Sequence, residues 1–321
     1  MPEVSVIMST YNEKLQYLTE AIESVLNQTF KNYEFIIILD NPQNDAIRDC
    51  VYQYAEKDFR IKVIENDSNI GLTKSLNKAI QNANGKYMSR MDADDIMHKN
   101  CLECELAVIK KYHLDFVSAS KINIDEHGKR LGIYINNISP KQMKKLLPYD
   151  NSINHSTTMV RMDLIRKENG YREIPSCEDY DLWLRLLFHG CRMRLLPNVF
   201  LLYRMRADGV CGQNAYQLYL SKRFLLKMCK ICKKNPSIWN SKRAFMNFIE
   251  EQDMSENKKN KFNRAFELMY KSFTYLKNKE YKDGTICILQ AIYLDKDILW
   301  IILNKFRYQI RKKLVPYFVC F

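Results

Sequence analysis

The sequence predicts an α/β fold with a mainly parallel sheet, followed by a region made only of helices. Over residues 1–215, short β-branched apolar runs alternate with stretches whose apolar residues recur every three or four positions. Strands that alternate with helices of this length are typical of parallel sheets covered by helices. After residue 215 no strand pattern is found. The chain has 321 residues, 46% of them hydrophobic, which is enough for a substantial core.

The first third of the chain contains four strand patterns and three helix patterns in alternation. The apolar run Phe35 to Leu39 has no polar interruption, as expected of a strand buried on both faces. The predicted strands cover residues 4–9, 35–39, 61–64 and 87–90, and the predicted helices begin at Leu15, Asn44 and Gly71. Such a sheet places Thr10, Asp40 and Asp92, which follow three of these strands, at one edge.

The middle third combines strands and helices less regularly. Residues 116–120 and 132–135 flank Glu126-His127-Gly128-Lys129, which predicts a hairpin. Residues 155–160 and 199–203 have strand patterns, and residues 177–188 form a predicted helix with acids in its first turn.

Charge divides the chain at the same place as the strand pattern. Residues 1–215 hold 28 Lys and Arg against 28 Asp and Glu, whereas residues 216–321 hold 22 against 9. We expect a nucleotide-binding domain over 1–215 and a basic helical region over 216–321, with helices at 218–232, 237–250, 258–277 and 283–303. Basic helices containing aromatic residues favour an anionic membrane surface over nucleic acid. Nucleic acid is not expected as a partner.

No apolar window reaches the roughly 20 residues needed to cross a bilayer. Residues 298–303, followed by basic residues up to Lys313, predict either an interfacial helix or a helix packed on the protein with a solvated basic face. The N-terminus shows no secretory leader pattern, so we expect a cytoplasmic protein, peripheral on the inner face of the membrane, with its ten cysteines reduced. The spacings Cys101-x-x-Cys104 and Cys229-x-x-Cys232 fall in helix patterns without a supporting ligand set for zinc.

The densest negative charge is Asp92-Ala93-Asp94-Asp95, directly after the predicted strand at 87–90. Crowded carboxylates are costly unless a cation neutralises them, which favours a divalent metal and a nucleotide diphosphate at Asp92 and Asp94. The alternative is a polar turn. In both cases Asp95 is expected to start the next helix.

Several segments, in this order, resemble glycosyltransferase family 2, which has the GT-A fold, a Rossmann-like sheet. They are Val4 to Glu13, Asp40, Asn69-Ile70-Gly71-Leu72, Asp92 to Asp95 and Glu178 to Trp183. Residues 69–95, together with His155-Ser156-Thr157 and Glu178 to Arg185, are similar to the bacterial exopolysaccharide and capsule branch. The resemblance covers about residues 3–206.

The resemblance implies an inverting, metal-dependent hexosyltransferase. Asp94, with Asp92, would hold Mn²⁺ or Mg²⁺ against the donor diphosphate. Asp179 would be the base and Glu178 would orient it or contact the acceptor. The nucleotide pocket would be formed by Thr10, Tyr11, Asn12, Glu13, Asp40, Lys74 and Asp92. For each of these residues a loop cap or a surface position is the alternative.

The sequence also departs from the family pattern. Tyr203-Arg204-Met205-Arg206 stands where many relatives carry a metal-binding His, so Arg204 and Arg206 would contact the diphosphate or belong to a solvated loop. His155 would be a site residue or a structural one. The Gln-x-x-Arg-Trp pattern of processive synthases is missing.

We therefore expect transfer of a single sugar, from UDP-hexose or UDP-N-acetylhexosamine, to a lipid-linked saccharide or oligosaccharide in surface polysaccharide synthesis. The alternatives are a sugar nucleotidyltransferase, disfavoured because no N-terminal glycine-rich phosphate loop is present, and a catalytically degenerate nucleotide-sugar-binding scaffold.

Overall fold

The computed structural model describes residues 1–206, 214–232 and 241–314, and the chain divides into two compact units. The first unit contains Met1–Lys144, Ser152–Arg172 and Glu178–Arg206. The second contains Lys145–Asn151, Glu173–Cys177 and the described part of Ala207–Phe321. The functional boundary expected between residues 215 and 216 stays a prediction.

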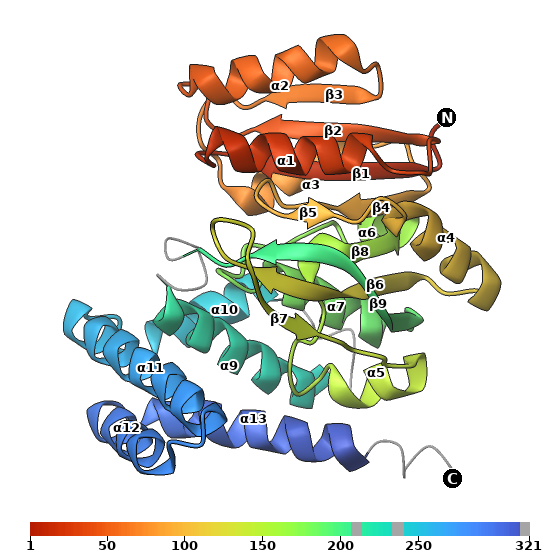
Figure 1. Ribbon diagram of the computed structural model, residues 1–321. Coiled ribbons are helices and arrows are strands. Elements are labelled where there is room, and N and C mark those ends of the chain that lie inside the picture. Colours follow the sequence, from red (N-terminus) through yellow and green to blue (C-terminus); the bar gives the residue numbers. More distant parts are fainter. Residues whose placement is uncertain (207–213, 233–240, 315–321) are drawn as a thin grey trace. The chain divides into compact units, whose positions relative to one another are not determined.

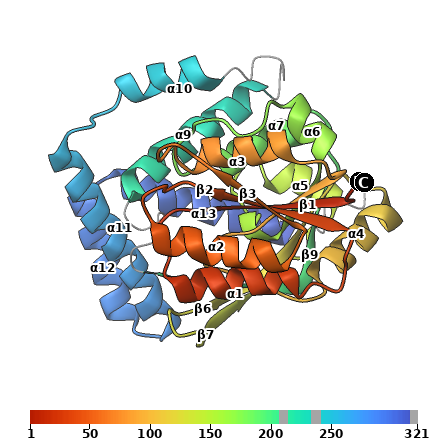
Figure 2. The ribbon, with the colours of Figure 1, turned by 90° about the horizontal axis from the view of Figure 1, so that it is seen from above.

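The first unit begins with the predicted parallel strands. Strand β1 (Val4–Thr10) pairs in parallel with β2 (Tyr33–Leu39) and β4 (Tyr87–Arg90), and β2 pairs in parallel with β3 (Ile61–Glu65). Helices α1 (Leu15–Leu26) and α2 (Asp45–Lys57) lie on one face of these strands and α3 (Leu72–Asn82) on the other (Figure 2). The Asn44 side chain caps α2 by accepting a hydrogen bond from Ile47 N at 3.2 Å.

The second half of the sheet contains most of its antiparallel pairs. The strand order is β3-β2-β1-β4-β8-β6-β9-β5, with β7 paired to β6 (Figure 1). Strand β6 (Phe116–Ile124) is parallel to β9 (Met193–Arg204) and antiparallel to β7 (Arg130–Tyr134) and β8 (Thr158–Arg161), while β5 (Ile96–Met97) is antiparallel to β9. The predicted α/β fold and the hairpin are confirmed.

Four further helices belong to this part of the chain: α4 (Cys101–Tyr112), α5 (Pro140–Leu146), α6 (Met162–Lys167) and α7 (Glu178–Phe188). On α7, the fully buried Trp183 packs edge-on against Phe116 at 4.9 Å between ring centroids. The close approach of β1 to the start of β4 requires a glycine, because a Cβ on Gly85 would lie 2.5 Å from Ser5 N.

Two local expectations in this unit are wrong. Asp95 does not start a helix: it precedes β5, and the next helix begins at Cys101. Its carboxylate accepts a hydrogen bond from Arg204 N at 2.9 Å, so β9 holds it in an extended segment. Residues His155–Thr157 form a 3₁₀ turn rather than the start of a strand, and the strand β8 begins only at Thr158.

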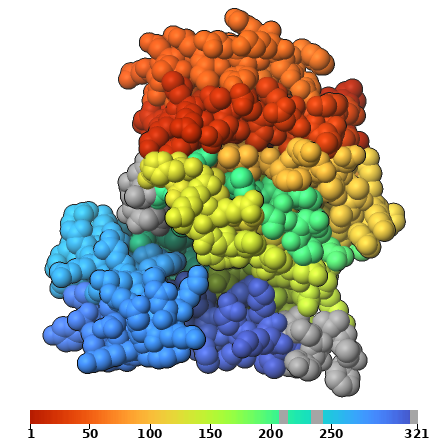
Figure 3. Space-filling view, viewed as in Figure 1, coloured from red at the N-terminus to blue at the C-terminus, as the bar shows by residue number. Residues whose placement is uncertain are grey.

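In the second unit, the described residues from 214 onward form helices joined by short turns: α9 (Ala215–Cys232), α10 (Ser241–Glu250), α11 (Glu256–Lys277), α12 (Tyr281–Leu294) and α13 (Asp297–Leu314). Figure 3 shows α11, α12 and α13 as one contiguous blue surface. The expectation of one helix over 283–303 is wrong, since Asp295 ends α12 and forms an ion pair with Lys258 on α11 at 2.7 Å. The start of the predicted helix at 237 lies outside the described residues. Within the described ranges, no helix is long and apolar enough to cross a membrane.

Candidate active site

The ends of β1, β2 and β4 meet at one edge of the sheet, as expected. Backbone hydrogen bonds align these ends: Asp40 N donates to Thr10 O at 2.9 Å, and Met91 N donates to Ile7 O at 3.0 Å. Thr10, Asp40 and Asp92 therefore follow neighbouring strands on the same side of the sheet.

The loop after β1 is fixed by its own polar side chains. Glu13 accepts hydrogen bonds from Thr10 Oγ1 at 2.6 Å and Tyr11 N at 2.8 Å. Asn12 accepts from Asn41 Nδ2 at 2.7 Å. These contacts fix the backbone, whereas the Tyr11 ring stays 43% exposed and can stack on a planar ligand.

Asp40 is buried and organises a second loop. Its carboxylate accepts from Asn66 Nδ2 at 2.7 Å and from the backbone N–H groups of Ile70 and Gly71, both at 2.9 Å. Gly71 has a φ of +83°, which favours glycine, and α3 begins directly after it. Lys74 lies exposed in the first turn of α3. Asp40 thus shapes the loop, and its carboxylate oxygens already have protein donors.

The charge of Asp92 is neutralised by Arg90, whose side chain is almost fully buried. The two side chains form an ion pair, and Ser156 bridges them, since its hydroxyl accepts from Arg90 Nη1 at 3.1 Å and donates to Asp92. Burial raises the pKa of Asp92, but the Arg90 charge and hydrogen bond outweigh it and the net pKa is lowered. Asp92 is therefore ionised at neutral pH.

Asp94 and Asp95 have the opposite electrostatics. Burial and the Asp92 charge raise the pKa of Asp94 to about 6, although its ion pair with Arg206 at 3.1 Å opposes the change. Burial, then Asp92 and Asp94, raise the pKa of Asp95 well above its ordinary value. Asp95 Oδ2 has no hydrogen-bond partner among the described residues. The loop carries more negative charge than the protein compensates.

Arg204 is a buried anchor. Its Nε donates to Asp94 O at 2.9 Å, its Nη1 to Glu126 O at 3.2 Å, and its Nη2 pairs with Glu20 at 2.5 Å. The guanidinium also lies 4.2 Å from the centroid of the Tyr17 ring. These contacts favour a structural role for Arg204 over diphosphate binding. Arg206, which is paired with Asp94, is the better placed of the two arginines for an anionic ligand.

Glu178 and Asp179 begin α7, where the helix dipole favours negative charge. Asp179 accepts a hydrogen bond from Tyr180 N at 2.5 Å. Burial, followed by the Asp179 charge, raises the pKa of Glu178 to about 7. Arg90 lowers and Asp92 raises this same pKa, so Glu178 lies within electrostatic reach of the Asp92 loop.

His155 belongs to an aromatic cluster beside these acids. Its Nε2 lies 2.8 Å from the hydroxyl of buried Tyr171, and its ring packs edge-on against Tyr171 and Trp183. Burial, then Arg90, lowers the pKa of His155 well below its ordinary value. Of the two roles that the sequence allows for His155, site residue or structural residue, a neutral imidazole held in this way favours the structural one.

The oxygen donors of the loop fit a small divalent cation. Mg²⁺ is commonly held by one or two carboxylates together with substrate phosphates, and Asp92 and Asp94 supply that number from one loop. The uncompensated Asp95 oxygen and the raised pKa of Asp94 both indicate room for positive charge. Over residues 1–206, 214–232 and 241–314, no three His, Cys, Asp or Glu side chains converge to hold a metal by themselves.

Sequence reasoning missed two residues of this site, Arg90 and Tyr171. In the sequence, Arg90 is only the last residue of the predicted strand over 87–90. Its position two residues before Asp92 could have indicated a contact between the two side chains, because alternate residues of a strand face the same side. No sequence signal links Tyr171 to His155, since their contact depends on the fold of residues 155–171.

Comparison with known proteins gives consistent results. The family model "Glycosyl transferase family 2" matches residues 5–168. An uncharacterized glycosyltransferase of Methanocaldococcus jannaschii is 35% identical over 77% of this chain and 83% of its own length. The O-antigen biosynthesis glycosyltransferase WbnJ of Escherichia coli is 32% identical over 72% of this chain and 95% of its own.

Two solved structures share the fold. TarS of S. aureus, in complex with UDP-GlcNAc, superposes with a TM-score of 0.56 at 18% identity, over 90% of this chain and 79% of the other. The mannosyltransferase PcManGT of Pyrobaculum calidifontis, in complex with GDP-Man and Mn²⁺, superposes with a TM-score of 0.57 at 16% identity, over 93% and 86%. At these identities the superpositions establish a GT-A fold.

Proposed function

The chain belongs to glycosyltransferase family 2, and from this premise we propose that it transfers a single sugar, with inversion, from a UDP-hexose or UDP-N-acetylhexosamine to a lipid-linked saccharide. The relative WbnJ is named for O-antigen biosynthesis, which supports a role in surface polysaccharide synthesis. The observation that carries the proposal is that the 3₁₀ turn His155–Thr157 joins the Asp92 loop to α7: Ser156 donates to Asp92, and the His155 ring packs against Trp183 of α7 at 5.9 Å between ring centroids.

The edge of the sheet supplies the donor pocket in this proposal. The exposed Tyr11 ring would stack on the base, and the loop that Asp40 holds through Ile70 and Gly71 would line the opposite side. TarS was solved in complex with UDP-GlcNAc and PcManGT in complex with GDP-Man, and of these two bases we propose uridine for the donor.

Asp94 and Asp92 would hold Mn²⁺ or Mg²⁺, which when bound neutralises the charge of the leaving diphosphate. Arg206, already beside Asp94, would lie near the same phosphates. The charge of Arg90 keeps Asp92 ionised, so the Asp92 carboxylate stays available as an oxygen ligand for the metal.

Asp179 would act as the base. It would accept the proton of the acceptor hydroxyl as that oxygen bonds to the anomeric carbon, while the bond from this carbon to the diphosphate oxygen breaks on the opposite face. Glu178, with its pKa near 7, would orient Asp179 or contact the acceptor. Only one displacement occurs, so the anomeric configuration inverts.

The basic helical region would hold the enzyme on an anionic membrane. On α13, five apolar side chains recur at helical spacing and are each 41% to 64% exposed: Leu299, Leu303, Phe306, Ile310 and Leu314. The opposite face of α13 is buried through Ile298, Asn304 and Tyr308. Exposed Arg307 and Lys313 accompany the apolar stripe, an arrangement typical of helices that lie in the bilayer interface.

The direct test is a donor screen that measures nucleotide release from UDP-, GDP- and dTDP-sugars with Mn²⁺. We expect one donor to be turned over and Asp179→Asn to lower kcat by at least about 100-fold while donor affinity is kept. Asp45→Asn is the matched control, because Asp45 is likewise a first-turn helix acid but lies on α2. No release from any donor, with Asp179→Asn indistinguishable from wild type, would contradict the proposal.

A further inference from the structure

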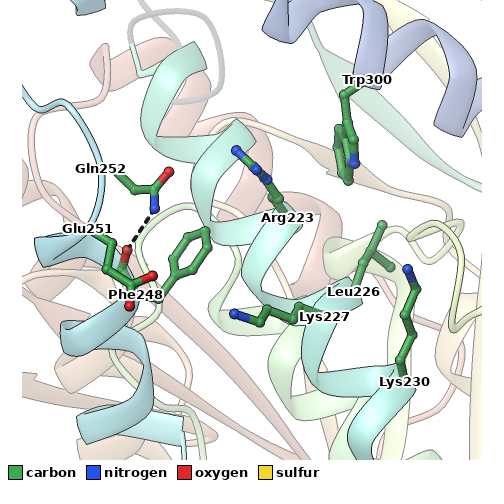
Figure 4. A pocket seen from close by; sticks show the side chains of 8 residues that line it. All are labelled: Arg223, Leu226, Lys227, Lys230, Phe248, Glu251, Gln252 and Trp300. Atoms are coloured by element: carbon green, nitrogen blue, oxygen red, sulfur yellow. Dashed lines mark hydrogen bonds between the residues drawn. The ribbon is translucent and has the colours of Figure 1, made fainter.

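A cavity of about 340 Å³ opens among the helices of the second unit, with a lining that combines cations and aromatic rings. Arg223, Lys227 and Lys230 project from α9, with Phe248 of α10 on one side and Trp300 of α13 on the other (Figure 4). The volume lies within the range of small-ligand sites, at its lower end.

Two of the three cations, Lys227 and Lys230, have no acid partner among the described residues. Arg223, Lys227 and Lys230 stand at positions i, i+4 and i+7 of one helix, where like charges destabilise each other. Glu251 is the one carboxylate in the lining. Lys227 lies 5.9 Å from the Phe248 ring centroid, and among the described residues neither it nor Lys230 has a carboxylate partner.

Arg223 is fixed in direction by its neighbours. Its Nη1 donates to Tyr219 Oη at 3.2 Å, and that hydroxyl donates to Asp297 at 2.8 Å. Asp297 also pairs with Lys258 at 2.8 Å, but Lys258 is shared with Asp295 at 2.7 Å, so part of the Asp297 charge faces Arg223 through the Tyr219 hydroxyl. The remaining N–H donors of Arg223 suit a phosphate, whose oxygens accept two parallel hydrogen bonds.

We propose that this cavity binds the phosphate group of an amphiphile, with Arg223, Lys227 and Lys230 on the phosphate and Phe248 and Trp300 against the first carbons of the apolar chain. A lipid-linked acceptor and an acidic phospholipid share this chemistry. Trp300 follows Leu299 on α13, so the aromatic wall and the exposed apolar stripe belong to one helix. The assignment rests on the proposed function, because a lipid-linked acceptor carries such a phosphate.

Calorimetric titration of the full chain tests the site, with EDTA present so that no metal assists diphosphate binding elsewhere. Farnesyl diphosphate is expected to bind saturably at one site and at least about tenfold more tightly than inorganic pyrophosphate, because its chain contacts the rings. Equal affinities for the two probes would overturn the assignment to an amphiphile.

Lys227→Gln combined with Lys230→Gln should weaken farnesyl diphosphate binding by about tenfold or more. Lys261→Gln combined with Lys277→Gln makes the same charge change on exposed lysines of α11 outside the cavity and should leave affinity unchanged. An equal loss in both pairs, or no loss in either, would overturn the site. Lys227 and Lys230 line the cavity, whereas Lys261 and Lys277 do not. All four side chains are exposed, so neither double variant changes the core.

Sedimentation with phosphatidylglycerol vesicles separates the two sources of the phosphate. If the Lys227 and Lys230 double variant loses both vesicle binding and farnesyl diphosphate binding, the site accepts lipid phosphates in general. Loss of farnesyl diphosphate binding alone supports an isoprenoid carrier. Asp179→Asn should bind farnesyl diphosphate as wild type does, so a chain that binds this probe but transfers no sugar would contradict the proposed function alone.

Discussion

The buried guanidinium of Arg90 forms an ion pair with the carboxylate of Asp92, and Ser156 is hydrogen-bonded to both. Only 1% of Arg90 is exposed, so its charge is available to this site and not to solvent. The pair fixes both the position and the ionisation of the first carboxylate of the loop.

Arg90→Met should destabilise the fold by about 3 kcal/mol, because it leaves the Asp92 charge without its partner. Urea unfolding at pH 7 measures the change. Arg161→Met is the control: Arg161 also pairs with aspartates, but its side chain is 40% exposed, and the loss should stay below about 1 kcal/mol. Equal losses in the two variants would show that the buried Arg90–Asp92 ion pair stabilises the fold no more than an exposed pair does.

The raised pKa of Glu178 predicts a pH-dependent stability. A carboxyl whose pKa rises from 4.5 to about 7 on folding binds more protons in the folded state between these values, so the free energy of unfolding should fall as pH rises from about 4.5 to 7. In the Glu178→Gln variant this decrease, roughly 3 kcal/mol in the wild type, should be absent. Chemical unfolding at pH 5 and pH 8 measures it, and an unchanged slope in the variant would contradict the shift.

Metal affinity should depend on pH through Asp94. Since the pKa of Asp94 is about 6, Mn²⁺ affinity should weaken as pH falls below about 6, where protons compete for the carboxylate. Arg206 lowers that pKa, so Arg206→Gln should move the loss to higher pH. Titration of Mn²⁺ followed by its electron spin resonance signal measures both. A shift to lower pH would be the wrong sign for this ion pair.

Asp40→Asn should loosen the loop before α3. The amide presents its NH₂ group to backbone donors that now point at a carboxylate, at a cost of about 2–3 kcal/mol. Hydrogen exchange at the amides of Ile70 and Gly71 should accelerate, and the KM for donor should rise. Normal protection of these two amides would exclude the proposed shaping of the pocket by Asp40.

Acidic substitutions in the apolar stripe of α13 should abolish membrane binding. Leu303→Glu with Phe306→Glu places two charges on the surface proposed to enter the bilayer interface, and co-sedimentation with anionic vesicles should fall by about tenfold or more. Phe59→Glu is the control, because Phe59 is 97% exposed and lies outside α13. Unchanged sedimentation of the double variant would leave the stripe without this role.

Local patterns predicted the first half of the sheet and the edge that carries the site. The uninterrupted run Phe35 to Leu39 and the helical spacing after Leu15 are determined by near neighbours in the chain, and β2 and α1 follow them closely. The positions of Thr10, Asp40 and Asp92 follow from parallel strands alone, since such strands end at one edge of the sheet.

Long-range contacts account for what the sequence did not reveal. Asp95 predicts a helix start because Asp is a favoured N-cap residue, and only its bond to Arg204, 109 residues later, shows it as part of an extended segment. The helix expected over 283–303 breaks where Asp295 meets Lys258 on another helix. In the sequence nothing distinguishes Arg90 from other strand residues, and only the fold shows that it is buried and paired with Asp92.

Strand β9 lies between β6 and β5 in the sheet, and its last residue, Arg204, contacts Glu20, Asp94 and Asp95. The order of synthesis therefore sets the order of assembly. A nascent chain that has emerged only as far as α7 contains every carboxylate of the proposed site, yet Asp94 and Asp95 lack their hydrogen bonds from Arg204 until the residues up to 204 have left the ribosome. We therefore expect the segment that holds Asp94 and Asp95 to reach its final geometry only when β9 joins the sheet.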